Sequence, residues 1–294
     1  MDLPQLHAFL AVARTLHFGH AAERLHLAQP AVSARVRALE ASLGVALFER
    51  TTRSVALTAA GLDFLPEAEA AVAQVAKAGA AARRAAGRDR PVLRLAGIDS
   101  ATVGLCPFLI RASRHRHPDL DFRVTEMLSR EANEALARGF CDMAFGRLPP
   151  AARDVTGRLV LRERIVAILP EDHPLTARPH LAAADFAGAA LVMPSRQHRP
   201  ILHDILTGWL AEGGVHLPPV LEANERHMML ALVASGLGLS LAPAWVASFA
   251  FAGVAFRPLE ETAPRVETYA IWRGRDADPY LAGFVAGLPD APID

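Results

Sequence analysis

Residues 16–43 constrain the chain most, because they predict two short helices joined by a tight turn. The first helix is expected to begin near Gly19, a residue accepted at the N-cap. Pro30 falls in the first turn of the second helix, where the backbone N–H groups have no partner within the helix. Apolar residues then recur at helical spacing: Val32, Val36, Leu39 and Leu43. One face of the second helix is therefore predicted to pack against a core.

The opposite face of this second helix has side chains suited to the major groove of DNA. It carries small residues and one long cation, with two polar residues beside them: Pro30, Ala34, Arg37 and Ala41, with Gln29 and Ser33. Gln and Arg bind adenine and guanine edges, and small apolar groups contact thymine methyls. For the helix pair alone, an ordinary amphipathic surface helix remains the alternative.

Residues 47–58 strengthen the DNA-binding interpretation, since they predict two short strands around a polar turn. This wing carries Arg50 and Arg53, placed to contact phosphates or the minor groove. Residues 1–57 contain six arginines and four acidic residues, an excess too small to indicate nucleic-acid binding by itself. Lys77 is the only lysine, so phosphate contacts are expected from arginine, whose guanidinium donates two parallel hydrogen bonds.

From Met1 to Gly61 the chain resembles the winged helix–turn–helix domain of LysR-type transcriptional regulators. The matching stretches are MDLPQLHAFLAVARTLHFGHAAERLHLAQPAVS, LEASLGVALFER and LTAAG. The resemblance implies DNA contacts from the second helix and the wing, by Gln29, Pro30, Ser33, Arg37, Arg50 and Arg53. The family usually has Arg then Gln after this serine, whereas this chain has Ala34 then Arg35. Both residues are expected in the interface. Because Ala34 lacks the contact that an arginine would make there, we expect the operator preference to differ from that of the family.

An alanine-rich segment, residues 59–90, predicts a long linker helix capped by Thr58 and ending in an arginine-rich hinge. Its small and apolar residues follow coiled-coil spacing: Leu65, Ala68, Val72, Val75, Gly79 and Ala82. Pro66 falls early in this helix. The seam predicts pairing with a second subunit, as a homodimer or homotetramer, with two recognition helices on one face of an inverted-repeat operator. Packing on the chain's own C-terminal domain is the alternative.

From Pro91 onward, strands alternate with helices, which is typical of parallel sheets with flanking helices. The expected strands are 92–98, 120–127, 142–148, 162–169, 191–193, 220–223 and 266–272. The expected helices are 102–117, 130–138, 200–212, 226–235 and 279–288. Ligands of such folds bind at the carboxyl ends of strands, facing helix N-termini.

This second region also resembles LysR-type regulators, through LRLAGIDSATVGLCP, CDMAFGRLP, LRERIVAILPEDHPL and LVASGLGLSLAP. The resemblance is strongest to the subgroup that senses aromatic acids and muconates. It implies an α/β fold with two lobes of periplasmic-binding-protein type that enclose a small effector. Two strands, near 162–165 and 266–268, are expected to cross between the lobes. The expected domains are 1–58 for DNA binding, 59–90 for dimerisation and 91–294 for effector binding, with lobe I at 91–162 and 268–294 and lobe II at 163–267.

Four first-lobe residues are candidate effector contacts. Ser100 and Thr102 lie where a strand turns into a helix, and Ser129 starts the next helix. Arg147 ends a strand, where its guanidinium could hold a carboxylate through two hydrogen bonds. Ser129 serving only as a helix cap, and Arg147 pairing with a core acid, remain the alternatives.

In the second lobe, the loop 194–199 is expected to close over the effector. Arg196 and His227 complete the candidate site, and Asn224 is expected to face it. His227 as an ordinary surface or core histidine is the alternative.

Two departures from the subgroup affect the expected effector, a small carboxylate. Asp99 stands where the subgroup usually has glycine, and Val103 where it often has tyrosine. An acidic residue beside an anion site weakens carboxylate binding, unless Arg196 neutralises it or the effector also carries a donor group.

Other functional classes are disfavoured by the sequence. Cys106 and Cys141 lack metal-ligand spacing and are interpreted as core thiols, with a redox switch as the alternative. No catalytic triad or phosphate-binding loop is evident, and 236–238 fits a helix C-cap better than a dinucleotide site. We therefore expect no enzyme activity, cofactor or metal. The N-terminus lacks a signal-peptide pattern and the longest uncharged run, 228–256, is interrupted by glycine and proline, so a cytoplasmic protein without a membrane span is expected.

A regulator whose C-terminal domain only oligomerises, without a ligand, also fits the sequence.

Overall fold

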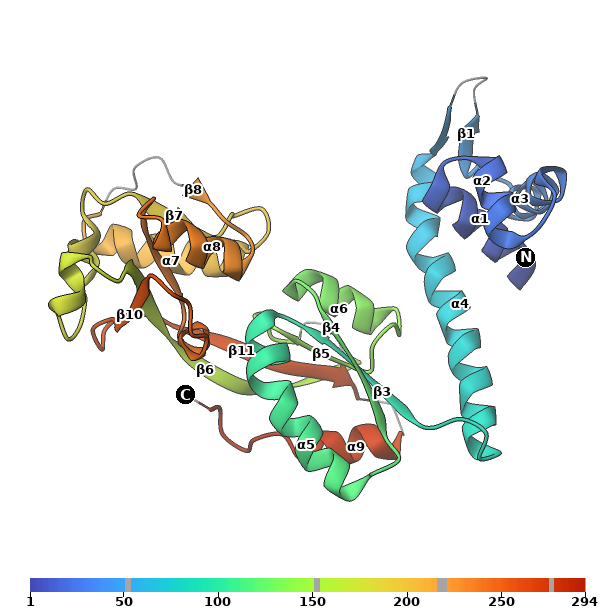
Figure 1. Ribbon diagram of the computed structural model, residues 1–294. Coiled ribbons are helices and arrows are strands. Elements are labelled where there is room, and N and C mark those ends of the chain that lie inside the picture. The colour runs from blue at the N-terminus through green and yellow to red at the C-terminus, as the bar shows by residue number, and fades with distance from the viewer. Residues whose placement is uncertain (51–53, 151–153, 216–220, 275–277, 294) are drawn as a thin grey trace. The chain divides into compact units, whose positions relative to one another are not determined.

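The computed structural model describes residues 1–50, 54–150, 154–215, 221–274 and 278–293 (Figure 1). The chain forms two compact units. The N-terminal unit comprises Met1–Pro91 with Ala135–Phe140, and the C-terminal unit comprises Val92–Glu134 with Cys141–Asp294. Among the described residues, the helices are too short or too polar to cross a lipid bilayer.

Three helices form the core of the N-terminal unit: α1 (Leu3–Thr15), α2 (Phe18–Leu25) and α3 (Gln29–Leu43). Phe9 of α1 lies at its centre and is fully buried. The expected start of α2 near Gly19 is corrected to Phe18, because His17 is the N-cap. The His17 Nδ1 atom accepts hydrogen bonds from the backbone N–H groups of Gly19 and His20, at 3.1 and 3.2 Å.

Helix α3 has the predicted apolar face, except at its end. Val32, Val36 and Leu39 are fully buried, and Pro30 lies in the first turn, as predicted. The prediction for Leu43 is wrong, since Leu43 is 37% exposed. Leu43 is the last residue of α3, and Gly44 turns the chain away with a φ of 73°, so the apolar face stops one turn early.

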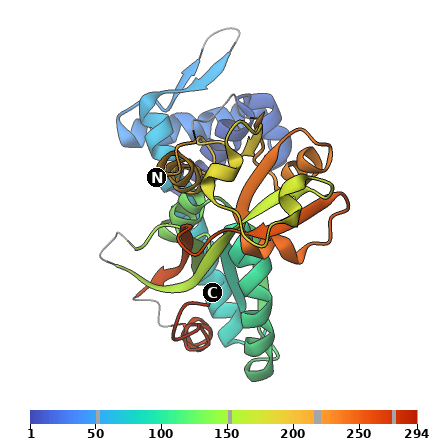
Figure 2. The ribbon, with the colours of Figure 1, turned by 90° about the vertical axis from the view of Figure 1, so that its left-hand side faces the viewer.

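The predicted wing is present as strands β1 (Phe48–Arg50) and β2 (Val55–Leu57). They pair antiparallel, with Phe48 opposite Leu57, and the hairpin projects beyond the helices in Figure 2. Arg53 lies outside the described residues.

The linker helix α4 spans Ala59–Ala85, and the Thr58 side chain caps it by accepting a hydrogen bond from the Gly61 N–H. Leu65, Ala68 and Val72 of the expected dimer seam pack into the core of their own N-terminal unit. Further along the helix, Val75 is 48% exposed. The first half of the seam therefore contributes to the core of its own subunit, whereas Val75 in the second half is exposed.

The C-terminal unit is built on one continuous sheet with the strand order β4-β3-β5-β11-β6-β9-β7-β8, and β10 pairs with β6. The strands are β3 (Val92–Gly97), β4 (Asp121–Glu126), β5 (Met143–Gly146), β6 (Val155–Pro170), β7 (Leu191–Met193), β8 (Leu221–Glu222), β9 (Leu239–Pro243), β10 (Val254–Pro258) and β11 (Arg265–Arg273). The α-helices are α5 (Cys106–Arg116), α6 (Ser129–Ala137), α7 (Pro200–Glu212), α8 (Arg226–Ala234) and α9 (Pro279–Val285). Shorter helical turns are η1 (Ser100–Leu105), η2 (Pro174–Ala177), η3 (Ala183–Phe186) and η4 (Ala244–Ser248).

Two lobes share this sheet. Lobe I contains β3–β5 with α5, α6 and α9, and lobe II contains β7–β10 with α7 and α8. The long strands β6 and β11 run antiparallel to each other and connect both lobes. Strand β11 pairs with β5 of lobe I, while β6 pairs with β9 and β10 of lobe II. Each lobe has its own buried core.

The predicted parallel pairing is correct within each lobe but wrong for the connecting strands. Strands β3, β4 and β5 are parallel, as are β7, β8 and β9. Strands β6, β10 and β11 pair antiparallel. The strand expected at 162–169 begins at Val155, and strands β9 and β10 are not among the expected strands.

The helix expected at 102–117 is divided. Residues 100–105 form a π-helical turn, and α5 begins at Cys106. Pro107 lacks an N–H group, so it cannot continue the hydrogen-bond ladder of the preceding turn. Such π-helical turns occur frequently at functional sites, and this one begins beside Asp99.

Candidate functional site

The solvent face of α3 presents most of the predicted DNA-contacting residues together. Gln29, Pro30, Ala34 and Arg37 are exposed, while Ser33 and Arg35 are half-buried. The Arg37 Nε atom donates a hydrogen bond to the Ser33 carbonyl at 3.3 Å. The rest of the guanidinium extends from the surface, where a base edge or phosphate could bind it.

Arg50 of the wing instead contacts its own domain. Its Nη2 donates to Glu40 Oε2 at 2.7 Å, and its guanidinium lies 4.8 Å from the centroid of the Phe18 ring. The other Glu40 oxygen accepts hydrogen bonds from the N–H groups of Leu47 and Phe48, at 2.9 and 3.2 Å. Glu40 therefore ties the wing to α3, and Arg50 helps to hold the wing in position.

The C-terminal unit contains a cavity of about 560 Å³ with walls from both lobes. Lobe I supplies Ile98, Leu128, Ser129, Arg130, Glu131, Arg147 and Leu148. Lobe II supplies Gln197, His198, Arg199, Pro200, Ile201 and Leu202. The volume suits a small organic molecule, and the walls combine aliphatic side chains with arginines.

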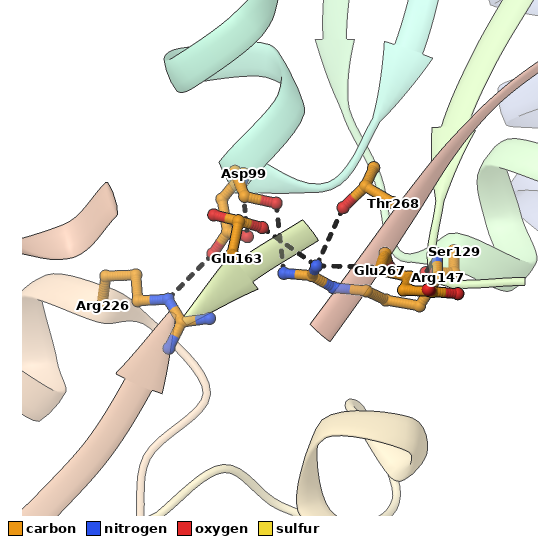
Figure 3. Close-up of polar contacts among 8 residues, drawn as sticks. Asp99, Ser129, Arg147, Glu163, Arg226, Glu267 and Thr268 are labelled. Carbon is orange, nitrogen blue, oxygen red and sulfur yellow. Dashed lines mark hydrogen bonds and ion pairs between the residues drawn. The ribbon is translucent and has the colours of Figure 1, made fainter. Parts of the chain in front are cut away.

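Arg147 follows strand β5 and lies almost fully buried at this cavity (Figure 3). Its Nη1 donates to Glu163 Oε2 at 3.0 Å, to Thr268 Oγ1 at 2.8 Å and to the Glu267 carbonyl at 3.3 Å. Its Nη2 donates to Ser100 Oγ at 3.2 Å. The alternative that Arg147 pairs with a core acid is thus realised through Glu163, although Arg147 still lines the cavity.

Burial governs the titration of this pair. Burial raises the pKa of Glu163, and the positive charge of Arg147 only partly opposes this. Burial likewise lowers the pKa of Arg147, opposed by the charge of Glu163. The ion pair therefore offsets part of the cost of burying each of these charges.

Ser129 begins α6, as predicted, and also lines the cavity. Its Oγ accepts a hydrogen bond from the Arg147 backbone N–H at 3.0 Å. Ser100 is not a wall residue, but its Oγ contacts the wall residue Arg147. The Thr102 hydroxyl donates to the Asp99 carbonyl at 3.4 Å, and Thr102 is not among the wall residues.

Asp99 is buried and joins the two lobes. Its Oδ2 lies 3.0 Å from Arg199 Nη2 and 3.0 Å from Arg226 Nε, and both arginines belong to lobe II. Burial alone would raise the pKa of Asp99, but the charges of Arg226 and Arg199 outweigh this and hold the pKa below its usual value. The expectation that Arg196 neutralises Asp99 is wrong, because Arg196 is 71% exposed and pairs with Asp204 at 2.9 Å.

The loop 194–199 contributes His198 to the cavity wall. The Asn224 Oδ1 atom accepts a hydrogen bond from the Ser195 N–H at 3.3 Å. His198 Nδ1 lies 3.2 Å from Asn224 Nδ2 and 3.3 Å from Ser195 Oγ, so these two polar groups orient the His198 ring.

His227 is exposed and lies 6.0 Å, between ring centroids, from Phe249; it is not a wall residue. Val103 is also exposed, at 43%. Of the predicted effector residues, the structure thus brings Ser100, Ser129 and Arg147 together, and leaves Thr102, Arg196 and His227 apart from the cavity.

Three charged residues at this site were not selected from sequence: Glu163, Arg199 and Arg226. Glu163 lies within a strand, and Arg226 is the first residue of α8. Their partners are 16 and 127 residues away along the chain. The local sequence pattern did not identify Glu163 or Arg226 as site residues. Arg199 was part of the predicted loop 194–199 but was not selected by itself.

The cysteines behave as the predicted core thiols. Cys106 and Cys141 are free and buried, and burial raises the pKa of each thiol to about 12. The reactive form is the thiolate, which is scarce far below that pKa. We expect iodoacetamide at mildly alkaline pH to leave both thiols unmodified in the native chain and to alkylate both in guanidinium chloride. Mass spectrometry would detect either product, and fast labelling of a native thiol would contradict this and favour the redox switch.

Comparison with known proteins agrees with both parts of the chain. Residues 86–291 match the family described as LysR substrate binding domain, and residues 3–62 match the bacterial regulatory helix-turn-helix protein, lysR family. The Hca operon transcriptional activator HcaR of Escherichia coli (strain K12) is 33% identical over 286 residues, 97% of this chain and 96% of the relative. The regulator IlvR of Caulobacter vibrioides is 36% identical over 289 residues, covering 97% and 96%.

The fold agrees equally well with solved structures. Full-length CbnR in complex with its target DNA has a TM-score of 0.81 and 29% identity, over 98% of this chain and 99% of that chain. These families and relatives are transcriptional regulators rather than enzymes. The chain therefore belongs to the LysR-type transcriptional regulators, DNA-binding proteins with an N-terminal winged helix–turn–helix and a C-terminal effector-binding domain.

Proposed function

We propose that an organic carboxylate binds at Arg147, between the two lobes, and modulates operator binding or bending. In this proposal residues 1–58 contact DNA in the cytoplasm, residues 59–90 pair subunits, and residues 91–294 sense the effector. Binding changes the equilibrium between two arrangements of the lobes only if the effector has a higher affinity for one of them.

The buried charge at the cavity is the observation that carries the proposal. Among the described residues, three buried arginines, Arg147, Arg199 and Arg226, pair with two buried carboxylates, Asp99 and Glu163, and all five side chains are at most 13% exposed. The formal charge of this cluster is +1, from three positive and two negative groups. An unbalanced buried charge is costly, so a bound monoanion would be stabilised here.

The cavity walls support the same class of ligand. Ser129 at the start of α6 presents a hydroxyl and the N-terminal end of a helix, a favourable place for an anion. Ile98, Leu128 and Leu148 supply an apolar surface for the body of an aromatic or aliphatic acid. Beside them, Arg130 and Glu131 contribute opposite charges that cancel.

A thermal-shift screen of the purified chain against small carboxylates tests this directly. A ligand at about 100 times its Kd adds roughly 2.7 kcal/mol to the free energy of unfolding. We expect a shift with monocarboxylates and none with the corresponding amides, which share the shape but lack the charge. Equal shifts for acid and amide, or no shift with any acid, would contradict the proposal.

We further propose that two copies pair through the second half of α4 and bind an inverted-repeat operator. The exposed Val75 and the small residues Gly79 and Ala82 on the same seam support this pairing. Pairing the same helix from two copies creates two-fold symmetry, which an inverted repeat matches.

Arg37 is the residue on which the proposed DNA contact most depends. We expect Arg37→Ala to weaken operator binding by about 1–3 kcal/mol if the guanidinium reads a base, or to reduce the salt slope by about 1 if it binds a phosphate. Electrophoretic mobility shifts over a range of salt concentrations would measure both quantities. The exposed Arg111 on α5 supplies a control, Arg111→Ala, which should change neither. Wild-type affinity and salt slope in Arg37→Ala would remove Arg37 from the interface.

A sensor that only oligomerises is the second candidate. It is favoured by the hydrogen bonds of Arg147, which already go to Glu163, Thr268 and other groups of the protein. In that case no acid would shift the melting temperature, and operator binding would not depend on any small molecule.

A further inference from the structure

We infer that Asp99 determines the class of effector: its carboxylate takes the place of a second carboxylate on the ligand, so the cavity selects monocarboxylates over dicarboxylates. The inference rests on the proposed binding of a carboxylate at Arg147. It concerns which acids are accepted there.

Asp99 is placed to act on the cavity through its neighbours. Ile98, before it, lines the cavity, and Ser100, after it, accepts a hydrogen bond from Arg147. Figure 3 shows the Asp99 and Glu163 carboxylates in the middle of the cluster, with Arg226 on one side and Arg147 on the other. The Asp99 carboxylate is therefore part of the same buried charge cluster as the proposed anion site.

Arg199 is the residue for which Asp99 and a ligand would compete. It lines the cavity, its side chain is 13% exposed, and its Nη2 lies 3.0 Å from Asp99 Oδ2. A second ligand carboxylate at the lobe II wall would have to displace Asp99 from this arginine. Asp99 has the advantage in that competition, because an intramolecular group loses no translational freedom on pairing.

The charge balance leads to the same selectivity. With Asp99 ionised, the buried cluster is +1, so a monocarboxylate brings it to zero and a dicarboxylate to −1. Without the Asp99 charge, the cluster is +2, which matches a dicarboxylate. The Glu126 carboxylate adds negative charge near Asp99, since partial burial and then the charge of Asp99 raise the pKa of Glu126.

Arg226 retains binding capacity that Asp99 does not use. Its Nε donates to Asp99 at 3.0 Å, but Nη1 and Nη2 are buried without a hydrogen-bond partner. Such unsatisfied donors are rare and costly. Removing the Asp99 charge frees Arg199 at the cavity wall, and Arg226, which is buried behind the wall, adds a second positive charge that favours an anionic ligand.

The test compares acids that share one carbon skeleton. Isothermal titration calorimetry of the full chain would use hexanoate with adipate, and 3-methylbenzoate with isophthalate. In the pair that binds more tightly to the wild type, we expect the monocarboxylate to bind at least tenfold more tightly than the dicarboxylate. In Asp99→Asn, which keeps the side-chain shape and can still accept from the Ser100 N–H, we expect this ratio to move at least tenfold toward the dicarboxylate.

Two further variants make the result specific. Asp204→Asn removes one acid from the Arg196–Asp204 surface pair and gives the same change in net charge, so its ratio should remain that of the wild type. Asp99→Asn combined with Arg199→Gln should lose the increased dicarboxylate affinity of Asp99→Asn, because Arg199 is the cation that the second carboxylate needs. Asp99→Ser replaces Asp99→Asn if the latter does not fold, as judged by circular dichroism.

The outcomes separate the inference from the proposed function. Monocarboxylate binding by the wild type with an unchanged ratio in Asp99→Asn would overturn the inference alone, and would leave Asp99 as a structural tie between the lobes. Absence of binding for all four acids in the wild type and in Asp99→Asn would overturn the proposed carboxylate site, and the inference with it.

Discussion

Replacing Arg147 with methionine is expected to destabilise the C-terminal unit by about 3–5 kcal/mol, because it leaves a buried carboxylate without its partner. Glu163 is 8% exposed on its side chain and has Arg147 at 3.0 Å as its ion-pair partner. The same change removes the guanidinium proposed to hold the effector. Urea unfolding followed by tryptophan fluorescence would measure the stability, and ligand-dependent operator binding would measure the response.

The double variant Arg147→Met with Glu163→Gln separates these two effects. No buried carboxylate is left without its partner in this variant, so we expect most of the stability to return while the carboxylate response stays absent. The exposed pair of Arg178 with Asp185 provides a control, since Arg178 is 58% exposed and Arg178→Met should cost at most about 1 kcal/mol. A normal response in the double variant would exclude Arg147 from effector binding, and wild-type stability in Arg147→Met would contradict the buried-pair argument.

Truncating Phe9 to alanine is expected to destabilise the N-terminal unit by about 3–5 kcal/mol and to abolish operator binding. Phe9 is fully buried in the N-terminal core. Its ring centroid lies 5.4 Å from that of Phe48 in the wing and 5.1 Å from that of Phe64 in the linker helix. Phe9 therefore joins α1 to two elements distant in sequence, so its loss leaves a cavity where they meet.

The operator affinity of Phe9→Ala and its free energy of unfolding in urea would be compared with those of Val45→Ala. Val45 is 48% exposed, so removing its methyl groups should alter stability by no more than about 0.5 kcal/mol. Full operator affinity in Phe9→Ala would show that the wing and the linker helix are held in place without this ring.

The N-terminal unit was largely predictable because its signals are local. Pro30 and the apolar spacing from Val32 to Leu39 specify α3 within a few turns of chain. Residues 47–58 specify a hairpin in the same way. The errors occurred at the ends of helices, where a single side-chain contact determines the boundary. His17 accepts hydrogen bonds from two backbone N–H groups and so sets the start of α2.

The C-terminal unit was predictable in its elements but not in their extent. Strand 191–193 and helix 200–212 occur as expected, since both are bounded by local breaks in pattern. Strand β6 continues back to Val155 because β11 pairs with residues 155–164 of β6. That pairing joins residues about a hundred positions apart, which no local pattern reports.

The sequence by itself determined the family, the helix pair with its wing, most of the order of strands and helices, and Ser129 and Arg147 as cavity residues. Each depends on side-chain periodicity or on a residue at the end of an element, which neighbouring residues fix. Only the tertiary structure decided the partners of the charges: Glu163 for Arg147, and Arg199 and Arg226 for Asp99. An ion pair forms wherever folding brings opposite charges within a few ångströms, and for Asp99 and Arg226 that meeting spans 127 residues. The buried balance of charge, on which the choice of effector depends, therefore exists only in the folded chain.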